Sequence, residues 1–208
     1  AERAQLQVDA PHVHVELISN LHEVAGAGAR FDLRRDLVFV GGFAHPPNVD
    51  GMTWFIGEVF PHIRAALPGV RFHCIGAQPP PSLHALAAGQ ADVIIHGFVP
   101  VVTPYMDEVR IAVAPLRFGA GVKGKVNLSM AHGQPVVATT CAVEGMHLRH
   151  GEDVLVADDA VAFAAAVVRL YQDEALWPTL STAGLRNVAR HFSLDAARDS
   201  VQRVFVAP

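Results

Sequence analysis

Two lysines stand two residues apart in a glycine-rich stretch, and their type and spacing suggest anion binding. Lys123 and Lys125 are the only lysines among 208 residues, and they lie in the sequence GAGVKGK. Glycines let a backbone approach a ligand closely, and the free N–H groups at the start of a helix favour an anion. This pattern is typical of a phosphate site. The alternative is a pair of solvated surface lysines, because the Walker arrangement is absent and GxG alone is weak.

The sequence lacks a complete set of residues for a metal site or for nucleophilic catalysis. His12 and His14 share one face of an expected strand, and His147 and His150 lie three residues apart. Neither pair has a third and fourth ligand at a suitable spacing, so we expect no metal site. No G-x-S-x-G elbow supports a serine hydrolase. The residue types alone name no catalytic residue.

Composition narrows the class of protein. The chain is 51% apolar and 17% charged, as expected for a packed globular domain, and its formal net charge of −4 with dispersed arginines argues against nucleic-acid binding. No apolar run reaches the roughly 20 residues of a membrane span. Cys74 and Cys141 suit a reducing compartment, so a cytoplasmic protein is expected. The helix-like start without methionine suggests a piece of something longer.

The elements that would position the two lysines alternate along the chain. Apolar runs predict buried strands at residues 36–40, 70–75, 93–96, 110–114, 135–139 and 154–157, and an alternating stretch predicts another at 12–19. Apolar periodicity predicts helices at residues 49–67, 82–88, 104–107, 122–131, 161–171, 176–191 and 194–206, after a helix end at 1–10 and a linker at 20–35. Pro61 predicts a kink or break, and Ser82 and Ser193 are expected helix caps.

This alternation predicts an α/β fold, a Rossmann-like parallel sheet with helices on both faces. Ligands bind such sheets beyond the carboxyl ends of the strands, near the switch in strand order. The glycine-bearing loops expected there are residues 41–48, 76–82, 97–99, 115–125 and 139–145. The two lysines therefore belong to a rim that five loops build together.

Four segments follow one another in a characteristic order and spacing: LVFVGGFAHPPNVDGMTWF, VIIHGFV, APLRFGAGVKGKVNLSMAHGQPVVAT and EGMHLRHGEDVLVADD. Together they resemble the C-terminal half of GT-B glycosyltransferases, most closely the retaining family 4 group. The resemblance covers roughly residues 34–205. It implies that residues 35–208 form a donor-binding domain and that residues 1–34 are the tail of a mostly absent acceptor domain plus a linker strand.

The resemblance also implies roles for the rim. The Gly41-Gly42 loop would approach the donor phosphates, the backbone of residues 97–99 would hold the nucleotide base, and Glu144 would face the sugar. His45 could instead cap its loop, and Arg117 could pair with an acid. The residues expected to contact the donor are Gly41, Gly42, His45, Asn48, Gly97, Phe98, Val99, Arg117, Gly119, Gly121, Lys123, Lys125, Asn127, Ser129, Glu144 and Gly145.

One departure from the family pattern bears on catalysis. Family members commonly carry Glu-x7-Glu across this loop and helix, and here the two positions are Ala120 and Leu128. Asn127 and Ser129 flank Leu128, although neighbours on a helix point roughly 100° apart.

Three functions remain open at this point. The first is the donor domain of a retaining glycosyltransferase that uses a UDP or GDP sugar without a cofactor. Its glycan or lipid acceptor would bind the missing domain, and the whole protein would be cytoplasmic or peripheral to the inner membrane face. The second is a catalytically silent sugar-nucleotide module. The third is a GT-B epimerase or phosphorylase.

Overall fold

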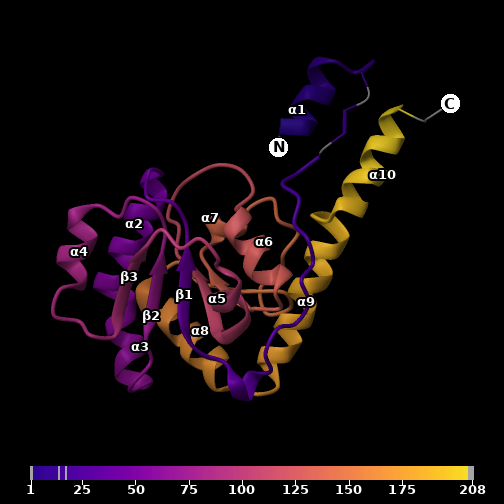
Figure 1. The fold of residues 1–208 in the computed structure, drawn as a ribbon. Helices are drawn as coiled ribbons and strands as arrows, with labels where there is room; N and C mark the ends of the chain where they lie inside the picture. Colours follow the sequence, from indigo (N-terminus) through magenta and orange to yellow (C-terminus); the bar gives the residue numbers. More distant parts are fainter. Residues whose placement is uncertain (1, 14, 17, 206–208) are drawn as a thin grey trace.

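In the computed structural model, which describes residues 2–13, 15, 16 and 18–205, parallel strands form one sheet in the order β3-β2-β1-β4-β5-β6 (Figure 1). These strands are β1 (Arg35–Val40), β2 (Phe72–Ile75), β3 (Val93–Gly97), β4 (Val109–Ala114), β5 (Val136–Ala138) and β6 (Leu155–Val156). The central strand β1 pairs with β2 through Leu37 and Phe72, and with β4 through Leu37 and Ile111. All six residues of β4 are buried, as the apolar runs predicted for strands covered on both faces.

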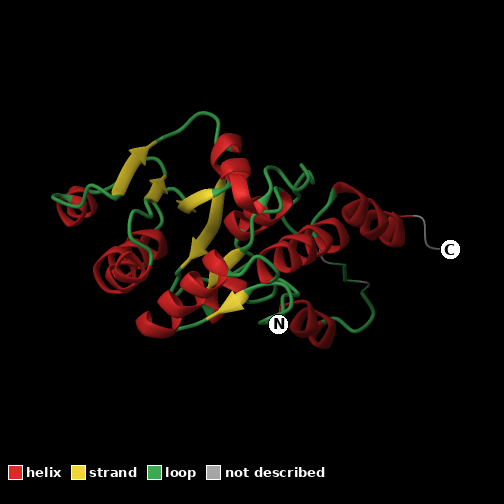
Figure 2. Ribbon diagram, turned by 90° about the horizontal axis from the view of Figure 1, so that it is seen from below, coloured by secondary structure: helices red, strands yellow, loops and turns green. Residues whose placement is uncertain are grey.

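Helices cover both faces of the sheet (Figures 1 and 2). They are α2 (Pro46–Trp54), α3 (Phe60–Ala66), α4 (Pro81–Ala87), α5 (Thr103–Glu108), α6 (Gly124–Ala131), α7 (Thr140–Val143), α8 (Ala160–Gln172), α9 (Leu176–His191) and α10 (Leu194–Phe205), with α1 (Glu2–Asp9) standing apart from the sheet. Helices α5 and α6 lie in front of the sheet in Figure 1, and α8 lies behind it. The α/β fold predicted from the sequence is therefore confirmed. No helix of the described residues is long and apolar enough to cross a membrane.

Three local predictions were wrong. None of the described residues in the range 12–19 forms a strand, and Val13 and Ile18 are 46% and 51% exposed, because no neighbouring strand pairs with them; His14 and Leu17 lie outside the described residues. Ser82 caps nothing, because α4 already begins at Pro81. The expected loop at residues 139–145 contains the short helix α7. By contrast, Ser193 caps α10 as predicted, since its Oγ accepts a hydrogen bond from the Ala196 N–H at 3.2 Å.

The kink expected at Pro61 takes the form of a wider helical turn. A π-helical segment, η2 (Phe55–Val59), joins α2 to α3, and Pro61 is the second residue of α3. Proline has no N–H to donate, and its ring clashes with the carbonyl four residues earlier. A π turn relieves this crowding without ending the helix. The long amphipathic stretch therefore stays continuous and presents Phe55, Phe60 and Ile63 to the core.

A buried arginine attaches the linker to the domain. Arg34 is fully buried, and its guanidinium donates hydrogen bonds to five backbone carbonyls. The acceptors are the carbonyl oxygens of Ala27, Ala29, Met106, Val109 and His132. Arg34 thus joins the linker to α5, β4 and the end of α6. The predicted division of the chain after residue 34 stays a prediction.

Candidate functional site

The candidate site lies where the strand order reverses. Connections after β1 lead toward β2, whereas connections after β4 lead toward β5, although β1 and β4 are neighbours. Two loops therefore diverge beyond the carboxyl ends of these strands. One follows Val40 and contains Gly41 and Gly42, and the other follows Ala114 and leads to Lys125 in α6. A crevice at this position is the general ligand site of open α/β sheets.

A partly buried ammonium joins the two loops. Lys125 Nζ donates a hydrogen bond to Asn48 Oδ1, and Asn48 Nδ2 donates to the Gly42 carbonyl at 2.6 Å. The same ammonium lies 4.5 Å from the centre of the Phe39 ring, which gives it a cation–π contact. We call Lys125, Asn48, Phe39 and Gly42 the Lys125 cluster. It connects the end of β1, the start of α2 and the start of α6.

The charge of this ammonium is not compensated by a carboxylate in the described part of the chain. The pKa of Lys125 is lowered to about 8, first because burial penalises the charged form and second because Lys123 repels it, while Cys74 acts in the opposite direction. An anion that enters the crevice would supply the missing counter-charge. Lys125 is therefore poised to gain more from an anionic ligand than a solvated lysine would.

Two glycines beside the Lys125 cluster allow close packing, because a side chain at either position would clash with a neighbouring atom. A Cβ atom on Gly41 would lie 2.8 Å from Lys125 Nζ and 3.0 Å from the Phe39 ring. A Cβ atom on Gly76 would lie 2.0 Å from the Gly41 carbonyl oxygen. By contrast, no atom lies within 4 Å of a Cβ placed on Gly42, so the space on that side of its backbone is open. Gly41 is thus required by packing, and Gly42 leaves room for a ligand.

The loop before α6 closes on itself. Lys123 Nζ donates hydrogen bonds to the carbonyls of Gly119 and Gly121, at 3.1 and 2.5 Å. Both glycines have positive φ, +121° and +76°, a conformation that side-chain-bearing residues rarely adopt. Cys141 Sγ also donates to the Gly119 carbonyl, at 3.5 Å. The two lysines therefore differ: Lys123 stabilises its own loop, and Lys125 lines the crevice.

Arg117 is committed to an ion pair. Its guanidinium donates two hydrogen bonds to the Asp50 carboxylate, at 2.8 and 2.5 Å, and lies 5.9 Å from the centre of the Trp54 ring. The interpretation that Arg117 pairs with an acid is confirmed. The contact joins the loop after β4 to α2.

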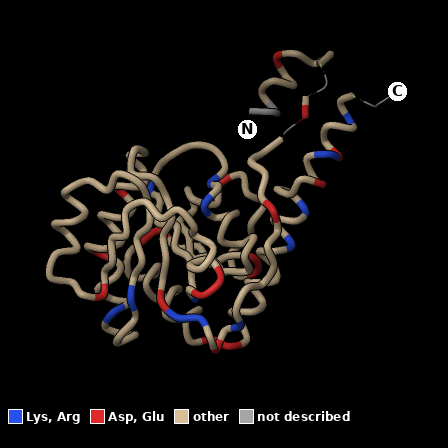
Figure 3. Tube along the Cα trace, viewed as in Figure 1, with Lys and Arg blue, Asp and Glu red and all other residues tan. Residues whose placement is uncertain are grey.

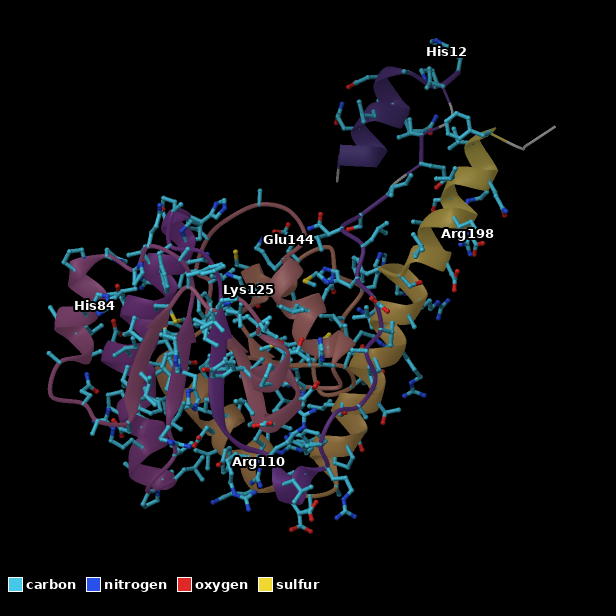
Figure 4. The ribbon with its side chains drawn as sticks, viewed as in Figure 1. His12, His84, Arg110, Lys125, Glu144 and Arg198 are labelled. Atoms are coloured by element: carbon cyan, nitrogen blue, oxygen red, sulfur yellow. The ribbon has the colours of Figure 1, made fainter. Side chains whose placement is uncertain are left out.

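Other expected donor-contact residues lie on the rim. Figure 4 shows Glu144 at the same end of the molecule as Lys125, and its side chain is exposed just after α7. Gly145 forms the turn that follows, with φ +72°. Gly97 ends β3 with φ +68°, and its carbonyl accepts a hydrogen bond from the Gly76 N–H at 2.9 Å. Phe98 is 73% exposed.

Three further residues sit close to these loops. Val99 is partly buried and packs against the core. His45 precedes α2 at its N-cap position and is exposed, but its side chain forms no capping hydrogen bond, so the loop-capping interpretation was wrong. The cap comes from the backbone instead, because the His45 carbonyl accepts a hydrogen bond from the Asn48 N–H at 3.0 Å.

The side chains that flank Leu128 do not reach the rim. Ser129 is buried, and its Oγ contacts Met106 Sδ at 3.8 Å. Asn127 is fully buried with no hydrogen-bond partner for its amide among the described residues, a feature for which we have no physical account. Leu128 packs against the core and Ala120 is exposed. Neither Asn127 nor Ser129 therefore substitutes for a rim carboxylate at these positions.

Sequence reasoning found Asn48 and Lys125 separately but missed their contact. The two residues are 77 positions apart, and no spacing rule links them. It also missed Phe39 and Gly76, whose roles depend on which strands are neighbours. The absence of an acid near Lys125 was equally invisible in the sequence. No group of three or more His, Cys, Asp or Glu side chains that could hold a metal occurs among the described residues.

Comparisons with solved structures place the fold among GT-B glycosyltransferases. A TarM mutant from S. aureus, in complex with fondaparinux, alpha-GlcNAc-glycerol and UDP, matches with a TM-score of 0.79 at 13% identity, over 98% of this chain and 42% of TarM. Anabaena HepE in complex with UDP and glucose matches with a TM-score of 0.67 at 12% identity, over 87% of this chain and 55% of HepE. Sucrose-phosphate synthase from Thermosynechococcus elongatus matches with a TM-score of 0.69 at 17% identity, over 100% of this chain and 58% of that enzyme.

Sequence comparison agrees with the fold. An uncharacterized 44.6 kDa protein in the cps region of Klebsiella pneumoniae is 26% identical over 147 residues, which are 67% of this chain and 38% of that protein. The chain thus spans well under two thirds of the length of these relatives. The family described as glycosyl transferases group 1 matches residues 34–173, which is more than half of the chain. The resemblance found in the sequence is confirmed, and the chain belongs to the glycosyl transferases group 1 family.

Proposed function

We propose that this chain is the donor-binding half of a glycosyltransferase and that it binds a nucleoside-diphosphate sugar in the crevice between β1 and β4. The observation that carries the proposal is Lys125, a partly buried ammonium at the switch point with no carboxylate partner in the described chain. The diphosphate would lie against Lys125 and the backbone of Gly42, since the Gly41 N–H already donates to the Ile75 carbonyl at 2.9 Å. TarM and HepE, which share the fold, were both solved with UDP, so UDP is the first nucleotide to test.

In the proposed reaction, this half of the protein would supply positive charge to the leaving diphosphate and would position the donor. Transfer of a sugar leaves a nucleoside diphosphate, and hydrogen-bond donors aimed at the developing charge lower the barrier. Lys125 would stabilise that charge at a pH below its pKa. Phe98 and the backbone around Gly97 would adjoin the base, and Glu144 would face the sugar. Retention of anomeric configuration and a glycan or lipid acceptor are inferred from the family resemblance, and the acceptor would bind the half of the protein that this chain lacks.

A calorimetric titration of UDP, GDP and ADP tests the proposal. We expect UDP to bind at pH 7 and Lys125→Met to weaken it by about 10- to 100-fold, the value of one hydrogen bond to a charged group. Arg169→Met is the matched control, because Arg169 is exposed on α8 outside the crevice. Failure of the folded protein to bind any of the three nucleotides would contradict the proposal, as would equal losses in the two variants.

The replaced acidic positions define a second test. Ala120 in the loop before α6 and Leu128 in α6 stand where the family pattern would place carboxylates. If the chain serves only as a sugar-nucleotide module, the full-length protein would bind UDP but would not hydrolyse or transfer any UDP-sugar. Transfer by the full-length protein would exclude that alternative, and loss of transfer in Glu144→Gln would then place Glu144 at the sugar.

A further inference from the structure

A second pocket with a volume of about 620 Å³ lies between α9 and the segment that joins α7 to β6. Arg186 and Arg190 contribute from successive turns of α9, and Arg149 contributes from the connecting segment. The imidazoles of His147 and His191 complete the basic part of the lining. None of these residues belongs to the Lys125 cluster. We call this pocket the α9 pocket.

The α9 pocket holds more positive charge than its own acid can balance. Asp153 is the only carboxylate among the described residues of its lining, and the neighbouring Glu152 pairs with Arg149 at 2.5 Å. The Asp153 carboxylate is already occupied, since it accepts a hydrogen bond from the Arg149 N–H at 3.0 Å and lies 3.8 Å from Arg149 Nε. The side chains of Arg186 and Arg190 are exposed and form no hydrogen bond or ion pair with any described residue. The excess is local, because the chain as a whole carries a formal net charge of −4.

Arginines elsewhere on the same side of the molecule are paired. Figure 3 shows the basic positions of α9 and α10 along one edge. On α10, Arg198 pairs with Asp195 at 2.7 Å and Arg203 pairs with Glu16 at 2.9 Å. The unpaired arginines, Arg186 and Arg190, thus lie on α9 and line the α9 pocket. Like charges one helical turn apart repel each other, so an anion between them would relieve a repulsion that the chain itself leaves in place.

The two histidines of the α9 pocket, His147 and His191, add positive charge to it only when they are protonated. Their rings stack at 4.2 Å between centroids with 15° between planes. Asn187 fixes the connecting segment from α9, because its Nδ2 donates to the Met146 carbonyl at 3.1 Å, and the next residue, His147, adopts φ +57°. Burial lowers the pKa of His191, and the charges of His147 and Arg190 lower it further. A bound anion would oppose the last two effects.

We propose that the α9 pocket binds a phosphate group, carried either by a soluble polyphosphate or by an anionic lipid headgroup. Guanidinium groups match phosphate oxygens with paired, planar N–H donors, and two of them stand one turn apart here. Imidazolium groups beside them add donors when protonated. The site is separate from the crevice of the proposed donor, so it gives the domain a second anion-binding surface rather than a further contact to the nucleotide sugar.

The first test uses inorganic pyrophosphate in the Lys125→Met background, which removes the ammonium of the proposed donor site. Binding is followed by the imidazole ¹H–¹⁵N resonances of His147 and His191. Arg186→Gln/Arg190→Gln is expected to weaken binding about tenfold or more, because each guanidinium contributes a charged hydrogen bond. Arg169→Gln/Arg198→Gln removes two charges from helices outside the pocket and is expected to change the affinity less than about twofold.

The protonation of His191 supplies a second measurement of pyrophosphate binding. The groups that face His191 are His147, Arg149 and Asp153 on the connecting segment and Arg186 and Arg190 on α9. Because the anion favours the protonated imidazole, the apparent pKa of His191 is expected to rise when pyrophosphate binds, and binding is expected to tighten as the pH falls from 8 to 6.

The second test distinguishes the two sources of phosphate. Vesicles of phosphatidylglycerol with phosphatidylcholine are sedimented with the wild-type chain and both double variants, and vesicles of phosphatidylcholine alone serve as the blank. Sedimentation lost only in Arg186→Gln/Arg190→Gln identifies a lipid headgroup, and pyrophosphate binding without sedimentation identifies a soluble ligand. The proposal is overturned if neither probe binds, or if the two double variants lose binding equally. UDP affinity, measured separately, is independent of either outcome.

Discussion

Lys125→Met removes the partly buried ammonium and keeps an unbranched side chain, so it measures what that charge does to the fold. The pKa of Lys125 is lowered from 10.5 to about 8 in the folded protein. One pH unit of difference corresponds to about 1.4 kcal/mol, so the charged form destabilises the folded protein by about 3 kcal/mol at pH 7. This loss of stability is expected to be offset when an anionic ligand binds beside Lys125, if the proposed donor site is correct.

The direction of the pH dependence follows from proton binding. Between about pH 8 and pH 10.5 the unfolded chain still holds the proton that the folded protein has released, so the free energy of unfolding rises with pH in that window. The wild type is therefore expected to gain about 2 to 3 kcal/mol relative to Lys125→Met between pH 7 and pH 10. The hydrogen bond to Asn48 is lost in the variant at every pH, so it contributes a constant offset.

Urea denaturation at pH 7, 8.5 and 10 measures this change in the free energy of unfolding. Arg169→Met is the control, because Arg169 is exposed and its guanidinium stays charged throughout this range. Its difference from the wild type is expected to be flat with pH. If the difference between the wild type and Lys125→Met is also flat, the ammonium is not held in a desolvated site and the reasoning about Lys125 is refuted.

Three further substitutions test the surrounding structure. Arg34→Met is expected to lower the free energy of unfolding by about 3 to 5 kcal/mol in urea denaturation, because five carbonyls lose their donor inside the domain; a loss below 1 kcal/mol would contradict this. Gly41→Ala is expected to lower the melting temperature and UDP affinity by displacing Lys125, whereas Gly42→Ala, with open space at its Cβ, is expected to keep the melting temperature. Arg117→Gln is expected to cost about 1 kcal/mol or less, since its ion pair with Asp50 is partly exposed; a large loss of UDP affinity without a loss of stability would instead place Arg117 on the ligand.

The fold could be predicted from the sequence because local patterns and global architecture agree. Apart from Arg110, the six residues of β4 are apolar, a pattern typical of a strand covered on both faces. The predictions failed where a local pattern lacked the neighbouring element that it needed, or where two structures fit the same pattern. The alternation at residues 12–19 lacks a neighbouring strand in the described chain, and Pro61 was accommodated by a π turn that no local rule distinguishes from a kink.

The site was predicted less completely, for a physical reason. Spacing placed Lys123 and Lys125 in one loop and treated them alike, but the fold separates them: one ammonium folds back onto its own loop and the other meets Asn48. Burial and the absence of a counter-ion depend on contacts between distant residues. The cation excess of the α9 pocket is hidden in the same way, because Arg149 and Arg186 meet only in the folded chain.

The most direct test of the central claim is to locate UDP on the protein by amide NMR at pH 7. The account predicts that saturating UDP shifts the backbone resonances of Gly41, Gly42 and Lys125, with smaller effects around Gly97, and that Lys125→Met needs about 10- to 100-fold more UDP for the same shifts at Gly41 and Gly42. Shifts confined to α9 near Arg186 would mean that the nucleotide binds the second pocket. That result, or the absence of any shift in the folded wild type, would contradict the assignment of the crevice between β1 and β4 as the donor site.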